Sequence, residues 1–281
     1  MTILVTGASG NVGKAVLATL QLRALPVRIA MSQPARPPPG VEAVRLSFTR
    51  PETFAAALEG ARAVFLLRPR ALSNMPKTLN LFIDEASKRG VEHIVFLSVA
   101  GADKNSFVPH AKVEAHLRAS NVAWTFLRPG FFAQNLGDAY RQDIVTNDRI
   151  YVPAGQGQAA FVDVRDVAAV AALAFTDPRH RGQAYTLTGA EELSFAAAAL
   201  LLTAALGRPI RYQAASIPGY AVHLLRRGLP AGQIAVQCIL HALLRRPGNA
   251  PVDPTLAALL GRTPTTLAQY ITDHVALWQR P

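Results

Sequence analysis

The sequence predicts an α/β protein whose core is a doubly wound parallel sheet with helices on both faces. The chain begins with a short apolar run of branched residues, Ile3–Val5, as a buried parallel strand would. A glycine-rich turn and an apolar helical pattern follow directly. Further short apolar segments then alternate with helical patterns, which is the rhythm of right-handed βαβ units.

The turn after the first strand has glycines at every third position. Gly7 allows a sharp turn off the strand, Gly10 lets the backbone approach a pyrophosphate, and Gly13 lets the helix pack tightly on the sheet. The helix start then presents N–H groups and the positive end of its dipole to phosphates. This context predicts a Rossmann-like dinucleotide site, and the alternative is a tight structural turn without a ligand. The expected cofactor contacts in the turn are Gly7, Ser9, Gly10, Asn11, Val12 and Gly13.

The later elements follow from the same patterns. Strands are expected at residues 27–30, 44–46, 64–67, 93–97, 123–127 and 184–187. Helices are expected at residues 51–58, 77–89 and 109–120, and another leads to residue 175. The remaining chain is expected to be mostly helical, at residues 194–206, 221–226, 231–246, 254–260 and 265–278.

The domain organisation follows from this order. Residues 1–155 are expected to form the nucleotide-binding domain, with residues 161–188 returning to it. Residues 189–281 are expected to form a smaller, mainly helical region that covers the substrate at the carboxyl ends of the strands.

Composition excludes several classes of protein. The chain has 281 residues, half of them hydrophobic, which is enough for a proper core and argues against disorder. The formal net charge of +11 is almost all arginine, but no nucleic-acid-binding motif accompanies it. The single cysteine, Cys238, excludes an internal disulfide and indicates a reducing, cytoplasmic compartment. We expect no membrane partner, no metal site because the histidines are scattered, and a monomer or homodimer.

The end of the second strand bears on cofactor choice. An acidic residue there would hold a ribose 2′-hydroxyl, whereas a basic one would accept a 2′-phosphate. The sequence has no carboxylate at this point. Ser32, Gln33 and Arg36 could instead hold a phosphate, so NADP(H) is favoured and NAD(H) is the alternative.

Several motifs occur in a characteristic order along the whole chain. They are T-G-A-S-G-N-V-G at 6–13, F-L-L-R-P at 65–69, F-L-S-V-A-G at 96–101, L-R-P-G-F-F-x-x-N at 127–135 and F-V-D-V-R-D-V-A at 161–168. This set resembles the NmrA-like branch of the atypical short-chain dehydrogenase/reductases. The resemblance implies an NAD(P)-binding oxidoreductase, since the family contains reductases of quinones, dyes, phenylpropanoids and polyketides. It also contains cofactor-sensing regulators that catalyse nothing. Relatives often carry an arginine where Ser32 stands.

The usual Ser-Tyr-Lys triad of short-chain reductases is missing. His110 stands at the position of the tyrosine, Glu114 at that of the lysine, and Ser98 near that of the serine. In one interpretation His110 is the acid and Glu114 holds its tautomer. In a second, His110 only touches the nicotinamide ribose, and the proton comes from water or from a substrate hydroxyl. In the third, His110 and Glu114 have no chemical role.

Two further groups of residues are expected at the site. Leu67, Arg68, Ser98, Pro129 and Phe131 are expected to contact the cofactor. Phe132 and Asn135 are expected beside a flat substrate, and the alternative for the phenylalanines is core packing.

The sequence therefore predicts NAD(P)H-dependent reduction of a carbonyl or quinone in a small, polyketide-like aromatic molecule. The specific expectation is a ketoreductase of antibiotic biosynthesis, similar to the tailoring enzymes of simocyclinone-type polyketides. The alternative is a non-catalytic, NAD(P)-sensing regulatory protein.

Overall fold

The computed structural model describes residues 1–32, 37–246, 248 and 251–280. The chain divides into two compact units. The first comprises Met1–Pro129, Val164–Leu187 and Ala258–Gly261, and the second comprises Gly130–Asp163, Thr188–Ala257 and Arg262–Pro281. Residues 130–155, which the sequence analysis placed with the nucleotide-binding domain, thus lie in the second unit.

The first unit is built on a seven-stranded parallel sheet with the order β10-β6-β5-β4-β1-β2-β3. This order reverses direction at β1, as in doubly wound dinucleotide-binding sheets. The strands are β1 Thr2–Thr6, β2 Val27–Met31, β3 Glu42–Arg45, β4 Ala61–Leu67, β5 His93–Leu97, β6 Ala123–Pro129 and β10 Gln183–Leu187. The predicted fold class is confirmed, and all seven expected strands are present.

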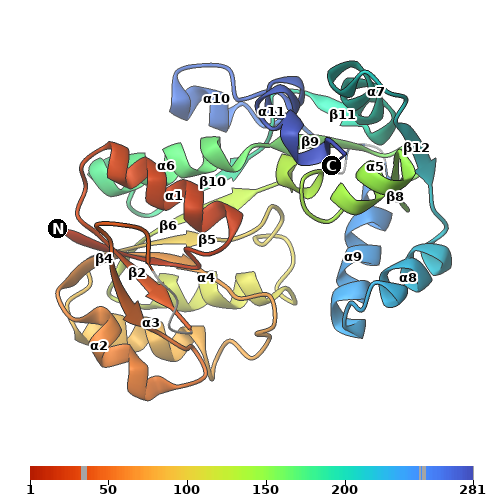
Figure 1. Ribbon diagram of the computed structural model, residues 1–281. Helices are drawn as coiled ribbons and strands as arrows, with labels where there is room; N and C mark the ends of the chain where they lie inside the picture. Colours follow the sequence, from red (N-terminus) through yellow and green to blue (C-terminus); the bar gives the residue numbers. More distant parts are fainter. Residues whose placement is uncertain (33–36, 247, 249–250, 281) are drawn as a thin grey trace. The chain divides into compact units, whose positions relative to one another are not determined.

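Helices cover both faces of this sheet (Figure 1). On one face α1 (Asn11–Leu22) packs against α6 (Val164–Thr176). On the other face α2 (Phe54–Leu58), α3 (Leu79–Lys88) and α4 (Pro109–Ala119) share a buried apolar cluster with the strands. Both faces of the central strands are therefore buried, which explains why β5 is apolar almost throughout and has no exposed residue.

The second unit combines helices with two small sheets. One sheet has the order β11-β9-β7, and in the other β12 pairs in parallel with β8. The strands are β7 Phe131–Phe132, β8 Arg149–Val152, β9 Gln158–Val162, β11 Glu192–Ser194 and β12 Arg211–Ala214. The helices are α5 Arg141–Asn147, α7 Phe195–Leu206, α8 Ile217–Arg226, α9 Ala231–Leu244 and α11 Leu267–Asp273, while α10 Thr255–Leu260 spans a boundary between the units. The short strands were not expected from the sequence.

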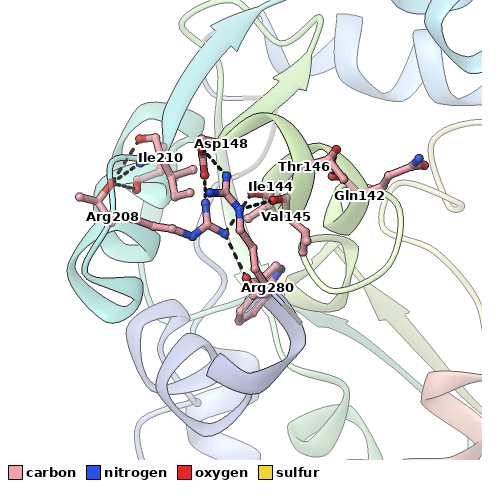
Figure 2. A network of polar contacts seen from close by, with 11 residues as sticks. Gln142, Ile144, Val145, Thr146, Asp148, Arg208, Ile210 and Arg280 are labelled. Carbon is pink, nitrogen blue, oxygen red and sulfur yellow. Dashed lines mark hydrogen bonds and ion pairs between the residues drawn. The ribbon is translucent and has the colours of Figure 1, made fainter.

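A polar network ties the end of the chain to α5 (Figure 2). Asp148 ends α5 in the left-handed conformation, with φ 49°. Arg280 donates from Nη2 to Asp148 Oδ2 over 2.6 Å and from Nε to the Val145 carbonyl over 3.0 Å. Arg208 pairs with the same carboxylate and donates to the carbonyl of Trp278 over 3.0 Å. The last turn of the chain is thus held to residues more than a hundred positions earlier.

Among the described residues, no helix is both long enough and apolar enough to cross a membrane. The same part of the chain contains no group of three or more His, Cys, Asp or Glu side chains arranged to hold a metal ion.

Candidate functional site

The glycine loop lies where β1 ends and α1 begins, at the point where the strand order reverses. Gly7 adopts φ +67°, in the region that glycine alone enters easily. A Cβ at Gly7 would also lie 3.1 Å from the Leu67 side chain. The loop is closed by a hydrogen bond from the Gly10 amide to the Gly7 carbonyl over 3.0 Å.

The other two glycines have different physical reasons. A Cβ at Gly13 would lie 2.1 Å from the Gly7 carbonyl oxygen, so only glycine fits between the helix and the loop. A Cβ at Gly10 would meet only the Gly7 carbonyl oxygen, at an ordinary 3.6 Å. Packing within the protein therefore explains Gly13 but not Gly10. Gly10 is exposed at the N-cap of α1, the end of a helix that favours a bound phosphate.

Thr6 fixes the distance between β1 and β4 beneath the loop. Its hydroxyl donates to the Phe65 carbonyl over 3.0 Å and accepts from the Leu67 amide over 2.8 Å. Both contacts are buried or half-buried, and they join the two strands on either side of the reversal. The crevice of a doubly wound sheet opens at this point, so Thr6 supports the floor of the dinucleotide site.

The remaining residues expected in the loop lie on different sides of it. Ser9 and Asn11 are exposed at the start of α1, whereas the side chain of Val12 is buried in the core. Ser32 follows β2 directly and is exposed. Gln33 and Arg36 lie outside the described residues, so their expected contacts stay predictions.

Arg68 directly follows β4, and it contacts His110 in the first turn of α4. Arg68 Nε donates to His110 Nε2 over 3.3 Å, and the Arg68 guanidinium also binds the carbonyls of Pro69 and Leu72. An imidazole that accepts at Nε2 carries its proton at Nδ1 when neutral. The hydrogen-bond partner of His110 is thus Arg68 and not Glu114, contrary to the first interpretation of the sequence.

The protonation state of His110 follows from these surroundings. Burial, and next the charge of Arg68, lower the pKa of His110 to about 4, although Glu114 opposes the shift. The imidazole is therefore neutral at neutral pH. A neutral imidazole can donate a hydrogen bond from Nδ1, but it is a poor source of a proton.

Glu114 is the centre of a buried ionic network. Arg128 at the end of β6 donates to both carboxylate oxygens, from Nε over 2.9 Å and from Nη2 over 2.6 Å. Arg118, one turn along α4, adds a contact of 3.0 Å. Burial raises the pKa of Glu114, but the hydrogen bonds from Arg128 and Ser98 and the two arginine charges outweigh burial, so the net shift is downward. Glu114 is therefore a carboxylate that holds β6 against α4.

Ser98 belongs to the same network. It follows β5 directly, is buried, and donates from its hydroxyl to Glu114 Oε1 over 2.6 Å. Its backbone amide donates to the Leu127 carbonyl on β6 over 2.7 Å. This placement makes Ser98 a positioning residue between two strand ends, and its catalytic role stays a prediction.

The residues after β6 divide between the units. Pro129 ends β6 in the first unit and is buried. Phe131 and Phe132 form β7 in the second unit, and Asn135 follows in a short 3₁₀ turn. The ring of Phe131 packs edge-on against Phe161, with centroids 5.4 Å apart. Core packing thus accounts for Phe131, and the cofactor and substrate contacts expected of these residues stay predictions.

Comparison with known proteins places the chain in a family. Residues 7–178 match the NAD(P)H-binding family. The chain belongs to this family. It is 34% identical over 282 residues to NAD(P)H azoreductase of Xenophilus azovorans, a match that covers 98% of each protein.

Solved structures agree on the fold. The NADPH-dependent quinone oxidoreductase QOR2 of Escherichia coli superposes with TM-score 0.81 at 25% identity, over 98% of this chain and all of that one. The triphenylmethane reductase of Citrobacter sp., crystallised with NADP(H), superposes with TM-score 0.82 at 20% identity, over 97% of this chain and 99% of that one. The predicted oxidoreductase class, NAD(P)H cofactor and NmrA-like fold are confirmed at the level of the family.

Two contributors to the site were not identified from the sequence. Arg128 stands in the L-R-P-G-F-F motif, but its buried bond to Glu114 joins residues on different elements. Thr6 precedes the first glycine, and its role appears only once β1 and β4 are neighbours. In both cases a polar residue inside an apolar strand end was the available signal.

Proposed function

We propose that this protein is an NAD(P)H-dependent reductase of quinones or of carbonyls on aromatic ring systems, in which no protein side chain supplies the proton. The single observation that carries this is the state of the triad positions. His110 is buried, neutral and bound by Arg68, while Ser98 is committed to the Glu114 network. The pKa values of His110 and Glu114 are both lowered, so neither group is a ready source of a proton at neutral pH.

The glycine loop fits the cofactor. Gly10 leaves room that packing within the protein does not require, and it stands at a helix start, which is typical of pyrophosphate sites. When bound, a reduced nicotinamide supplies hydride. Gly7, Gly10 and the first turn of α1 would hold its pyrophosphate, and Thr6 keeps β1 and β4 at the spacing that supports it.

The proton requirement narrows the substrate class. Reduction of a carbonyl adds a hydride at carbon and a proton at oxygen. Reduction of a quinone to a hydroquinone likewise takes up one hydride and one proton. A quinone, or a ketone beside a phenol, can take its proton from water or from its own hydroxyl. His110, with a proton on Nδ1, would orient the oxygen or the ribose by hydrogen bonding without losing that proton.

The relatives support this class. One is named an NAD(P)H azoreductase and another a quinone oxidoreductase. The narrower expectation, a ketone of an aromatic polyketide in antibiotic biosynthesis, is part of the same proposal and rests on the sequence resemblance. NADPH is proposed as the preferred cofactor because no carboxylate follows β2 at the position that would select NADH.

The test is NADPH oxidation, followed by absorbance, with a panel of quinones, azo dyes and polycyclic aromatic ketones. NADH is the second cofactor, and His110→Ala and His110→Phe variants run alongside. Turnover by the variants is expected to stay within about tenfold of the wild type, since general acid catalysis is worth about 10² or more. A loss of about 10² or more would assign the proton to His110 and overturn this mechanism.

A second readout separates enzyme from sensor. Binding of NADPH is measured by quenching of tryptophan fluorescence, independently of turnover. Tight binding without oxidation by any compound of the panel would contradict the reductase proposal and support the non-catalytic alternative.

A further inference from the structure

The helical hairpin formed by α8 and α9 carries an apolar surface that the described structure leaves uncovered. Helix α9 is apolar almost all round, with Gln233, Gln237 and His241 as its only polar side chains. Ile234 and Cys238 lie in the core of the second unit, and His241 on the same stripe is also buried. A helix that is apolar on every side is normally covered on every side, so the second face needs an explanation.

The second face lies opposite the buried one. Val236, Leu240 and Leu243 repeat with the same spacing of four and three residues, displaced by two positions, or about 200° around the helix. With Ile239, they are between 42% and 58% exposed. Soluble proteins rarely leave so many large apolar side chains together on one helix without a partner.

Helix α8 extends this surface. It packs beside α9 (Figure 1), buries Tyr220 and Leu224, and exposes Val222 and Leu225. Leu225 is 63% exposed. The exposed residues of both helices, Val222, Leu225, Val236, Ile239, Leu240 and Leu243, are called the hairpin face below.

Arginines stand at both ends of the hairpin. Arg226 and Arg227 lie at the turn between the helices, and Arg245 and Arg246 follow the end of α9. Between Glu192 and Asp253 the sequence has six arginines and neither aspartate nor glutamate. The hairpin face is therefore flanked by positive charge that its own segment does not neutralise.

Within the part of the chain that the structure describes, a carboxylate on another element compensates one of these arginines and none compensates the others. Arg227 lies 3.6 Å from the carboxylate of Asp143 on α5, which is buried and also binds His223. Among the described residues, Arg245 donates to the backbone carbonyls of Pro153 and Ala215 and has no carboxylate partner. Arg226 and Arg246 are exposed, and the described residues give neither an ion-pair partner.

We infer that the hairpin face binds the surface of an anionic lipid bilayer. An exposed apolar helix face with arginines at its margins is the pattern of segments that lie in the plane of a membrane interface. The leucine and isoleucine side chains would enter the acyl boundary, and the guanidinium groups would meet lipid phosphates. This association departs from the expectation of no membrane partner, which rested on the lack of a membrane-spanning segment in the sequence. It requires no such helix and does not depend on the proposed reaction.

The charges argue against a second copy of the chain as the occupant. Because arginines stand at both ends of the hairpin, parallel and antiparallel self-pairing alike would bring guanidinium groups together. An anionic surface is complementary at both ends.

The test uses the full chain with vesicles of equal parts phosphatidylglycerol and phosphatidylcholine, and with vesicles of phosphatidylcholine alone. Binding is measured by flotation at low and high salt. We expect binding to the anionic vesicles that weakens as salt rises, and little binding to phosphatidylcholine alone. No binding to anionic vesicles at low salt, or equal binding to both kinds, would overturn the inference.

The chain offers a matched pair of variants. Leu225→Gln/Arg226→Gln changes the end of α8, while Leu22→Gln/Arg23→Gln changes the same pair of residue types at the end of α1, where Leu22 is 89% exposed. The α8 variant is expected to lower vesicle partitioning by about tenfold or more, since one arginine is worth about fivefold at an anionic surface. The α1 variant should leave partitioning unchanged.

Two other outcomes would name a different occupant and so refute the bilayer. One is concentration-dependent dimerisation, measured by light scattering, that the α8 variant abolishes while vesicle binding is absent. The other is a raised KM of the α8 variant for a reduced compound of the panel above, with no vesicle binding. This would show that the hairpin face serves the reaction. Equal effects of the two double variants would also refute the proposal.

Discussion

Replacing Glu114 by glutamine should destabilise the first unit strongly, although the two side chains have almost the same shape. The Glu114 side chain is buried and binds Arg128 through both carboxylate oxygens, with contacts of 2.9 and 2.6 Å. An amide would leave the buried guanidinium without its counter-charge. Breaking a buried pair in this way costs about 3–5 kcal/mol in the free energy of unfolding.

The surroundings of Glu114 and Arg128 decide where in that range the loss of unfolding free energy falls. Asp103 lies 3.5 Å from Arg128 and is half-exposed, so it offsets part of the lost charge. Arg118 is also half-exposed and loses little when Glu114 becomes neutral. We therefore expect a loss near the lower limit, about 3 kcal/mol at neutral pH.

The pH dependence has a definite sign. The pKa of Glu114 is lower in the folded protein than its ordinary value of 4.5. Its contribution to stability is thus fully present above that value and disappears as the pH falls through the folded-state pKa. The difference between wild type and Glu114→Gln should accordingly be constant near neutral pH and shrink in acid.

The assay is urea unfolding followed by tryptophan fluorescence. Trp124 lies on β6, with the Arg118 guanidinium 5.3 Å from its ring, so its emission reports on this part of the unit. Asp103→Asn is the matched control, because it removes a half-exposed carboxylate from the same arginine and should cost less than about 1 kcal/mol. Equal effects of the two variants, or a pH-independent difference down to acid, would refute the assignment of a buried carboxylate.

The remaining predictions concern other residues. Gly13→Ala should prevent the loop from closing, with large losses of both stability and NADPH affinity, because its Cβ would lie 2.1 Å from the Gly7 carbonyl oxygen. Gly10→Ala should unfold like the wild type but bind NADPH at least about tenfold more weakly, as fluorescence titration would show. Since the pKa of His110 is about 4, the rate of reduction should show no inflection near pH 6.5, and an inflection there that His110→Phe removes would contradict the neutral imidazole. Trp278→Phe should cost about 1–3 kcal/mol in urea unfolding, because it leaves the buried Leu136 carbonyl without the indole N–H that binds it over 2.9 Å.

The seven-stranded sheet was predictable because the sequence signals that mark its strands are local. Most of the strands are short apolar runs bounded by a turn signal, and Gly7 and Gly13 mark a turn in which the first glycine has a positive φ and the second leaves no room for a Cβ. The short strands β8 and β12 escaped prediction because their partners are far apart in sequence. Strand β12 has no apolar run, and the run Ile150–Val152 of β8 lies beyond the point at which the regular alternation of strands and helices ends.

The hydrogen-bond partners of the side chains were harder to predict from the sequence than the fold. The spacing of His110 and Glu114 suggested that they bind each other, since residues four apart share a helix face. In the structure each finds a stronger partner on another element, Arg68 for His110 and Arg128 for Glu114. Such choices depend on which strand ends are neighbours, which a linear pattern does not encode.

The interleaving of the two units has a consequence for synthesis on the ribosome. When the chain has emerged only as far as Pro129, the sheet lacks β10, and α1 lacks the helix α6 that covers it. Residues 130–163, which belong to the other unit, must emerge before either missing element is made. We therefore expect a nascent chain of this length to expose the apolar side of α1 and to recruit chaperones until residue 187 has emerged.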